Sequence, residues 1–156
     1  MSSAKSALGL LVTLALTLSA GFIGSRFPVD DWYAALSKPA WTPPNSLFGP
    51  VWGVLYLIIA VAAWLVWRKA GLVGAAIPLA VFALQLLLNA AWSWLFFGLH
   101  QVGIALVEIA LLWLSIVATI VLFWRLNPAS GLLMIPYLLW VSFATALNFA
   151  IWRMNA

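Results

Sequence analysis

Long apolar segments, separated by short polar links, make up most of this sequence. An α-helix needs about 20 residues to cross the hydrocarbon core of a bilayer. Five segments have about this length or more, and they cover approximately residues 6–26, 47–67, 72–99, 104–125 and 131–152. The pattern predicts an all-α membrane protein, a bundle of five transmembrane helices. Because the segments use up most of the 156 residues, we expect a single domain over residues 1–156.

The composition indicates a surface that faces lipid. Hydrophobic residues make up 67% of the chain and charged residues only 6%, whereas a soluble domain carries roughly 25% charged residues. The seven Lys and Arg side chains are scattered, most of them at segment ends, as interfacial anchors are. We therefore expect a multi-pass integral membrane protein in contact with lipids, with no nucleic acid as partner. The sequence has no cysteine, which excludes disulfides and thiolate metal sites, and we expect no metal site.

The first apolar segment allows two interpretations. Lys5 followed by an apolar run is compatible with a cleaved signal peptide. The run is longer than a usual signal-peptide core, and Arg26 follows at a bilayer-spanning distance, so a retained helix is favoured. Small and hydroxyl side chains share one face of this helix and predict close helix packing. They are Thr13, Thr17, Ala20, Gly21 and Gly24.

The one long, turn-rich interruption lies between the first two segments, at about residues 27–46. It carries Trp32, Tyr33 and Trp41, and four of the chain's eight prolines fall between positions 39 and 50. Asp30 is placed to cap a short helix over residues 31–37, and Lys38 followed by proline would end that helix. A loop so rich in flat side chains predicts a structured lid over a ligand pocket.

Polar side chains inside the apolar segments predict which faces point into the bundle. Gln85 and Asn89 are one turn apart, and an amide in hydrocarbon is costly unless it finds a partner. The opposite face of that segment is small and apolar and is left to pack on another helix, which fits a homodimer. It contains Ala76, Ala80, Ala83 and Ala90. Glu108 is the only carboxylate within a span, and a functional and a structural role are equally compatible with its position.

Aromatic and polar side chains from several segments are predicted to meet inside the bundle. Ligand sites are mostly apolar and aromatic, with a few polar groups that fix orientation. Flat aromatic walls favour a large, flat, apolar ligand; the alternative is an interfacial aromatic belt together with ordinary packing. The candidate ligand-binding residues are Trp32, Tyr33, Trp41, Trp52, Tyr56, Gln85, Asn89, Trp92, Phe96, Tyr137, Trp140, Phe143, Ala144, Leu147 and Asn148.

A set of motifs covers essentially the whole chain. They are Trp32-Tyr33, Lys38-Pro39, Trp41-Thr42-Pro43-Pro44, Trp52 with Tyr56, Gln85, Asn89 and Trp92-Ser93, and Pro136-Tyr137-x-x-Trp140. In order and spacing they resemble the tryptophan-rich sensory protein family, known also as the TspO, translocator protein or peripheral-type benzodiazepine receptor family. The chain looks like a bacterial member.

The resemblance implies a usually dimeric five-helix bundle whose cavity binds protoporphyrin IX or a haem-related tetrapyrrole, with no required cofactor. The family's cavity positions match Trp32, Tyr33, Trp52, Tyr56, Asn89, Trp92, Trp140, Phe143, Ala144 and Asn148. A tetrapyrrole sensor, carrier or regulator is therefore expected. Light-dependent porphyrin degradation through Trp52 and Trp140 is one alternative, although no acid–base dyad supports ordinary catalysis. A small proton-coupled exporter that uses Glu108 is another.

Overall fold

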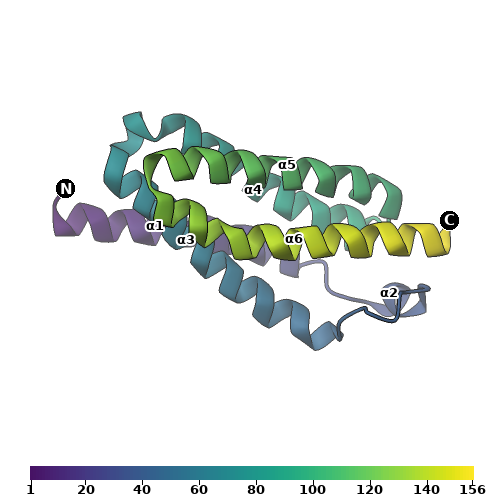
Figure 1. Cartoon of the computed structure of the whole chain (residues 1–156). Coiled ribbons are helices and arrows are strands. Elements are labelled where there is room, and N and C mark those ends of the chain that lie inside the picture. The colour runs from purple at the N-terminus through teal and green to yellow at the C-terminus, as the bar shows by residue number, and fades with distance from the viewer.

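The computed structural model describes residues 1–156 and contains helices but no strands (Figure 1). The long helices are α1 (Ser3–Ser25), α3 (Asn45–Gly74), α4 (Ala76–Ser93), α5 (Val102–Leu126) and α6 (Pro128–Asn155). A π-helical turn, η1 (Trp94–Gly98), extends α4, and the short α2 (Asp31–Ala35) lies between α1 and α3. Five helices are long and apolar enough to cross a membrane. The predicted all-α, multi-pass membrane protein is confirmed.

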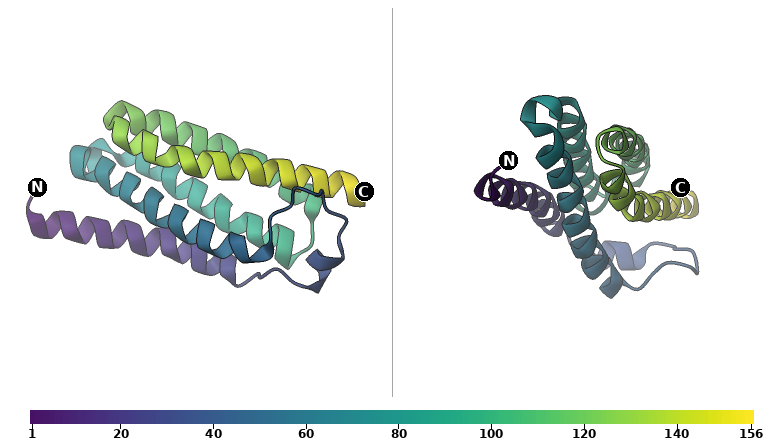
Figure 2. Two further views of the ribbon diagram at one scale, coloured as in Figure 1. Left: turned by 60° about the horizontal axis from the view of Figure 1, so that its bottom comes forward. Right: turned by 60° about the vertical axis from the view of Figure 1, so that its left-hand side comes forward.

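The five long helices run along a common direction and form one bundle (Figure 2). α1 packs on α3 and α4, α5 packs on α4 and α6, and α6 also contacts α3. The N-terminus lies at one end of the bundle. The C-terminus and α2 lie at the other end, which we call the α2 end.

The helix ends differ from the predicted ones at two places. The third span was expected to begin at residue 72, but α4 begins at Ala76, after a break in α3 at Gly71. Gly71 has φ 69° and ψ 178°, and glycine adopts such a left-handed backbone because it has no Cβ atom. The short helix in the first link also ends earlier than expected, at Ala35. Asp30 caps it as predicted, since its carboxylate accepts a hydrogen bond from the Tyr33 N–H.

Tight packing of α1 on α3 closes the N-terminal end of the bundle. A Cβ atom added to Gly9 would lie 1.7 Å from the indole ring of Trp67, so only glycine fits under this ring. Thr13, Thr17 and Ala20 are buried on the same side of α1, which confirms the small face predicted for close packing. Ala76, Ala80 and Ala83 of α4, by contrast, are exposed, and Ala90 of the same predicted face is half-buried. Ala83 and Ala90 border an apolar groove that α4 shares with α1.

A chain of hydrogen bonds ties three helices together in the middle of the bundle. The Tyr56 hydroxyl donates to Asn89 Oδ1 at 2.6 Å, and Asn89 Nδ2 donates to the Tyr137 hydroxyl at 2.9 Å. That hydroxyl in turn donates to Gln85 Oε1 at 2.6 Å. The amides of α4 therefore point into the bundle, as their cost in lipid predicts.

Candidate ligand-binding cavity

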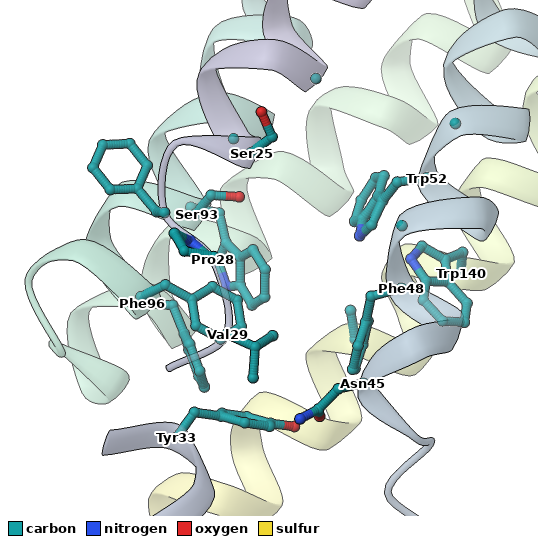
Figure 3. Close-up of a pocket in the computed structure, with 18 of the residues that line it drawn as sticks. Ser25, Pro28, Val29, Tyr33, Asn45, Phe48, Trp52, Ser93, Phe96 and Trp140 are labelled. Atoms are coloured by element: carbon teal, nitrogen blue, oxygen red, sulfur yellow. The ribbon is translucent and has the colours of Figure 1, made fainter. Parts of the chain in front are cut away.

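A cavity of about 680 Å³ lies at the α2 end of the bundle (Figure 3). Its walls come from the second half of α1, the α1–α3 link with α2, the first half of α3, the end of α4 with η1, and α6. The side chains that line it are mainly apolar, and none belongs to Asp, Glu, Lys, Arg or His. The space therefore offers an uncharged and largely aromatic environment.

Two glycines of α3 keep part of this space open. A Cβ atom added to Gly49 or Gly53 would find no other atom within 4 Å. Gly21 of α1 behaves differently, because an added Cβ would lie 2.6 Å from the ring of Tyr56. α1 and α3 therefore touch closely at Gly21 and Tyr56, while the first turns of α3 face open space.

Aromatic rings stand on two sides of the cavity (Figure 3). On one side, the Trp52 and Trp140 rings lie 6.3 Å apart at an angle of 86°, and Phe48 contacts Trp140 edge-on. On the other side, Trp92 and Phe96 stack with their centroids 5.1 Å apart. Flat faces on both sides suit a flat ligand.

Few polar groups lie beside this space, and two that belong to its lining residues are buried without a partner. Trp92 Nε1 donates to Asn148 Oδ1 at 3.0 Å, and Asn148 Nδ2 donates to the Val102 carbonyl. The Trp140 Nε1 and the Tyr33 hydroxyl are buried without any hydrogen-bond partner. Burial raises the pKa of Tyr33 above its ordinary value, so the hydroxyl keeps its proton at neutral pH and remains a donor.

The α1–α3 link is ordered by contacts of its own. The Lys38 ammonium donates to three carbonyl oxygens at the end of α2, those of Tyr33 at 2.7 Å, Ala34 at 3.2 Å and Leu36 at 3.0 Å. Its charge is well placed there, because a helix C-terminus is partially negative. Trp41 is 49% exposed and meets the ring of Phe143 edge-on at 5.6 Å. These contacts hold α2 so that Tyr33 borders the cavity.

Comparison with known proteins identifies the family of this chain. The family model described as TspO/MBR matches residues 10–153. The chain belongs to the TspO/MBR family. It is 43% identical to the human "Translocator protein" over 148 residues, which are 92% of this chain and 87% of that protein. It is 43% identical to "Protein CrtK" of Rhodobacter capsulatus over 140 residues, 87% and 86% of the two chains.

A third TspO/MBR relative covers nearly the full length. The "Tryptophan-rich protein TspO" of Chlorobaculum tepidum is 41% identical over 158 residues, 97% of this chain and 98% of that protein. The family resemblance that the tryptophan and proline motifs predicted is therefore confirmed. The names of these relatives describe one as a tryptophan-rich protein and another as a translocator protein.

In this TspO/MBR chain, the structure brings most of the predicted site residues to the cavity. The candidates that line it are Tyr33, Trp52, Tyr56, Trp92, Phe96, Trp140, Ala144, Leu147 and Asn148. The other candidates lie behind or beside it. Gln85, Asn89 and Tyr137 form the hydrogen-bond chain that holds Tyr56, and Trp41 and Phe143 pack on each other. Trp32 stacks on His100.

The sequence did not single out the wall that α1 and the link provide. This part of the lining includes Leu18, Gly21, Phe22, Pro28 and Val29. Gly21 was assigned to helix packing, which it also serves. The apolar residues carried no signal, because an apolar side chain on a membrane helix looks the same whether it faces lipid or a cavity.

Glu108 does not line the cavity of this family member. It is buried on α5, and neither of its carboxylate oxygens has a hydrogen-bond partner. Ala105 and Leu112 are buried on the same face, one turn to either side. The structure thus places Glu108 in the protein interior and not toward lipid.

Proposed function

We propose that this protein binds a porphyrin, with protoporphyrin IX as the reference ligand, and acts as a tetrapyrrole sensor, carrier or regulator in the membrane. The observation that carries the proposal is the uncharged, aromatic-walled cavity at the α2 end. Its volume of about 680 Å³ falls within the roughly 300–1,000 Å³ of small-molecule sites. The membership of the TspO/MBR family supports it.

The chemistry of the walls supports a flat, conjugated ligand. The opposed rings of Trp52 and Trp140 and of Trp92 and Phe96 offer flat faces and ring edges to a macrocycle. Trp140 and Tyr33 line the cavity, and each carries a buried donor that has no partner within the protein. Because no lining residue is charged, carboxylate substituents would stay at the mouth, since an unpaired buried carboxylate is costly.

A titration with matched tryptophan variants tests the proposal. Binding of protoporphyrin IX, followed by its absorption spectrum, is expected to weaken at least about tenfold in Trp140→Leu, because truncating a tryptophan anchor often costs 2 kcal/mol or more. Trp124→Leu is the control, since Trp124 is exposed and does not line the cavity. Equal affinity in the two variants would refute binding at this site.

The pair of cavity tryptophans favours one second candidate, light-dependent degradation of the bound porphyrin. Trp52 and Trp140 border the same space and their rings are 6.3 Å apart, so two oxidisable indoles would lie side by side against one face of a ligand. Loss of porphyrin absorbance under illumination measures this activity. Equal rates in the wild-type protein and in a Trp52→Phe, Trp140→Phe double variant would exclude it. No comparable contact connects Glu108 with the cavity, so the exporter hypothesis gains no support.

We also propose that two copies pair through the small face of α4. Ala76, Ala80 and Ala83 are exposed at helical spacing, and small residues let membrane helices approach closely. Because the chain has no cysteine, Ala80→Cys introduces a single thiol that is expected to cross-link between copies. Leu139→Cys, on an exposed position of α6, is the control. Equal cross-linking at both positions would argue against this interface.

A further inference from the structure

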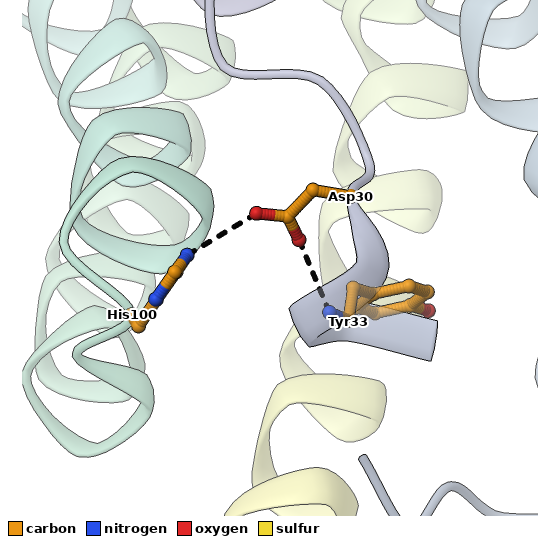
Figure 4. Close-up of polar contacts among 3 residues, drawn as sticks. All are labelled: Asp30, Tyr33 and His100. Carbon is orange, nitrogen blue, oxygen red and sulfur yellow. Dashed lines mark hydrogen bonds and ion pairs between the residues drawn. The ribbon is translucent and has the colours of Figure 1, made fainter. Parts of the chain in front are cut away.

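Two side-chain contacts fasten the α1–α3 link to different parts of the bundle. On one side, Asp30 contacts His100, which lies between η1 and α5 (Figure 4). On the other side, Asn155 near the end of α6 makes a paired contact with Ser37. The Ser37 N–H donates to Asn155 Oδ1 at 3.0 Å, and Asn155 Nδ2 donates to the Ser37 carbonyl at 2.8 Å. The first contact contains a titratable pair, and the second is neutral.

His100 is held against the link by two interactions. Its Nε2 lies 3.3 Å from Asp30 Oδ2, and its ring stacks on the indole of Trp32 at a centroid distance of 4.0 Å and an angle of 10°. The backbone at His100 is left-handed, with φ 56°, a conformation that few residues other than glycine adopt.

Asp30 joins this contact to the helix that borders the cavity. Its Oδ2 faces His100, while its Oδ1 accepts a hydrogen bond from the Tyr33 N–H at 3.1 Å and caps α2 (Figure 4). Tyr33 is the α2 residue that lines the cavity. One carboxylate therefore connects the α4–α5 turn, the first turn of α2 and the cavity wall.

No charged group other than Asp30 lies within ion-pair distance of His100. The elements around it carry few titratable side chains, namely Arg26 at the end of α1, Asp30, Asp31 and Lys38 on the link, Glu108 on α5 and Arg153 on α6. The pair of Asp30 and His100 is the only contact of ion-pair length in the structure. Lys38 is already bonded to the carbonyls at the end of α2.

We propose that Asp30 and His100 form a pH-dependent latch, in which the protonated imidazole holds α2 over the cavity and the neutral imidazole lets α2 open more readily. Histidine is the side chain whose charge ordinarily changes between pH 5 and 8. The imidazolium makes a charge-assisted hydrogen bond to the carboxylate and a cation–π contact with Trp32, and both are weaker for the neutral ring. Because His100 and Asp30 are 40% and 41% exposed, the effect is modest.

Amide hydrogen exchange of α2 in lipid nanodiscs tests the latch without any ligand. After correction for intrinsic exchange, we expect the amides of Tyr33 and Ala34 to be about two- to fivefold better protected at about pH 5.5 than at about pH 8. His100→Asn should abolish this ratio, since asparagine does not titrate and tolerates a left-handed backbone. Asp30→Asn should abolish it too while keeping the α2 cap, because asparagine is an equally good N-cap.

The neutral contact provides the matched control. Asn155→Ala is expected to lower the protection of the link at both pH values and to leave the ratio between them unchanged. Equal protection of the wild-type α2 at both pH values would overturn the latch, and so would a ratio that persists in His100→Asn or Asp30→Asn. Loss of protection at both pH values in His100→Asn would assign His100 a structural role and would also overturn it. None of these readings depends on porphyrin binding, so the latch and the proposed function fail separately.

Discussion

The two halves of α3 differ in how they meet their neighbours. In the second half, Ala60, Ala62, Ala63 and Val66 have no exposed surface. In the first half, a Cβ atom added to Gly49 or Gly53 would touch nothing. Toward the N-terminal end of the bundle, this helix thus buries small side chains that have no exposed surface, although Ala63 and Trp67 also border an apolar groove between α1 and α4. Toward the α2 end, the same helix borders the aromatic cavity. The packed half can fix the position of the walls, so that the other half holds a space its own side chains do not fill.

Tyr56 lies at the boundary between these halves. Its ring lines the cavity and contacts Gly21, while its hydroxyl starts the hydrogen-bond chain that passes through Asn89 to Tyr137. A cavity wall that is fixed by buried hydrogen bonds keeps its geometry without a ligand. If this division is correct, equivalent substitutions in the two halves should have different effects.

The largest difference is expected between two glycine-to-alanine substitutions. Gly9→Ala should destabilise the protein by about 1–3 kcal/mol, the usual cost of overpacking, because the new methyl group overlaps the Trp67 ring. Gly53→Ala should cost nothing, or stabilise by up to about 1 kcal/mol through its higher helix propensity. Unfolding of both variants in denaturant, in the same lipid or detergent, measures the difference. Equal midpoints for both variants would contradict the division of α3.

Two tyrosine-to-phenylalanine substitutions compare the hydrogen-bonded middle of the bundle with the α2 end, and a smaller difference in stability is expected. Tyr137→Phe removes a hydroxyl that accepts from Asn89 and donates to Gln85. We expect a loss of about 1–2 kcal/mol, because two buried partners lose a hydrogen bond. Tyr33→Phe should change the global stability by less than about 0.5 kcal/mol, since its hydroxyl has no partner to lose. A larger loss of stability in Tyr33→Phe than in Tyr137→Phe would contradict the expected difference between these two regions.

A smaller and local effect is expected where Lys38 ends α2. Lys38→Met keeps the apolar stem beside the Tyr33 ring and removes the three hydrogen bonds to the end of α2. The half-buried position limits the loss of stability to about 0.5–1 kcal/mol, and the loss should be confined to the link. Faster proteolysis or amide exchange in residues 31–38 would show it. A lowered global unfolding midpoint would mean that the link is part of the packed half.

Much of the fold followed from the sequence because the bilayer sets the length of a spanning helix. The break at Gly71 falls at the end of the predicted link of residues 68–71, where Arg68 and Lys69 interrupt the apolar pattern. That α3 stays helical through most of this link could not be foreseen. The π-helical turn at Trp94–Gly98 was also unpredicted. It depends on tertiary contacts, such as the close approach of the Phe27 ring to Gly98.

The site was predictable where the residue type was unusual for its position. Tryptophans and amides in a membrane segment predicted Trp52, Trp92, Trp140 and Asn148, and all of them border the cavity. Periodicity showed that Gln85 points inward. It did not show that the Tyr137 hydroxyl donates to Gln85 Oε1, so that Gln85 and Tyr137 both lie behind the cavity wall. Nothing in the sequence connected His100 with the link, because its partners Asp30 and Trp32 are about 70 positions away in the chain.

The smallest effect is expected at alkaline pH, where the ionisation of the Tyr33 hydroxyl can be measured by itself. Burial raises the pKa of Tyr33 in the closed structure above the ordinary tyrosine value of about 10. With α2 closed, Tyr33 therefore keeps its hydroxyl proton at a pH where it would lose the proton with α2 opened. The protonated Tyr33 hydroxyl therefore contributes to the free energy that holds α2 closed over the cavity. This contribution is complete below about pH 10 and is lost as the pH rises through the raised pKa of Tyr33. Phenolate absorbance of the wild-type protein minus that of Tyr33→Phe isolates this hydroxyl, and its midpoint should lie above 10. A midpoint at or below 10 would mean that α2 leaves Tyr33 in water, and the cavity would then lack the wall that the closed link gives it.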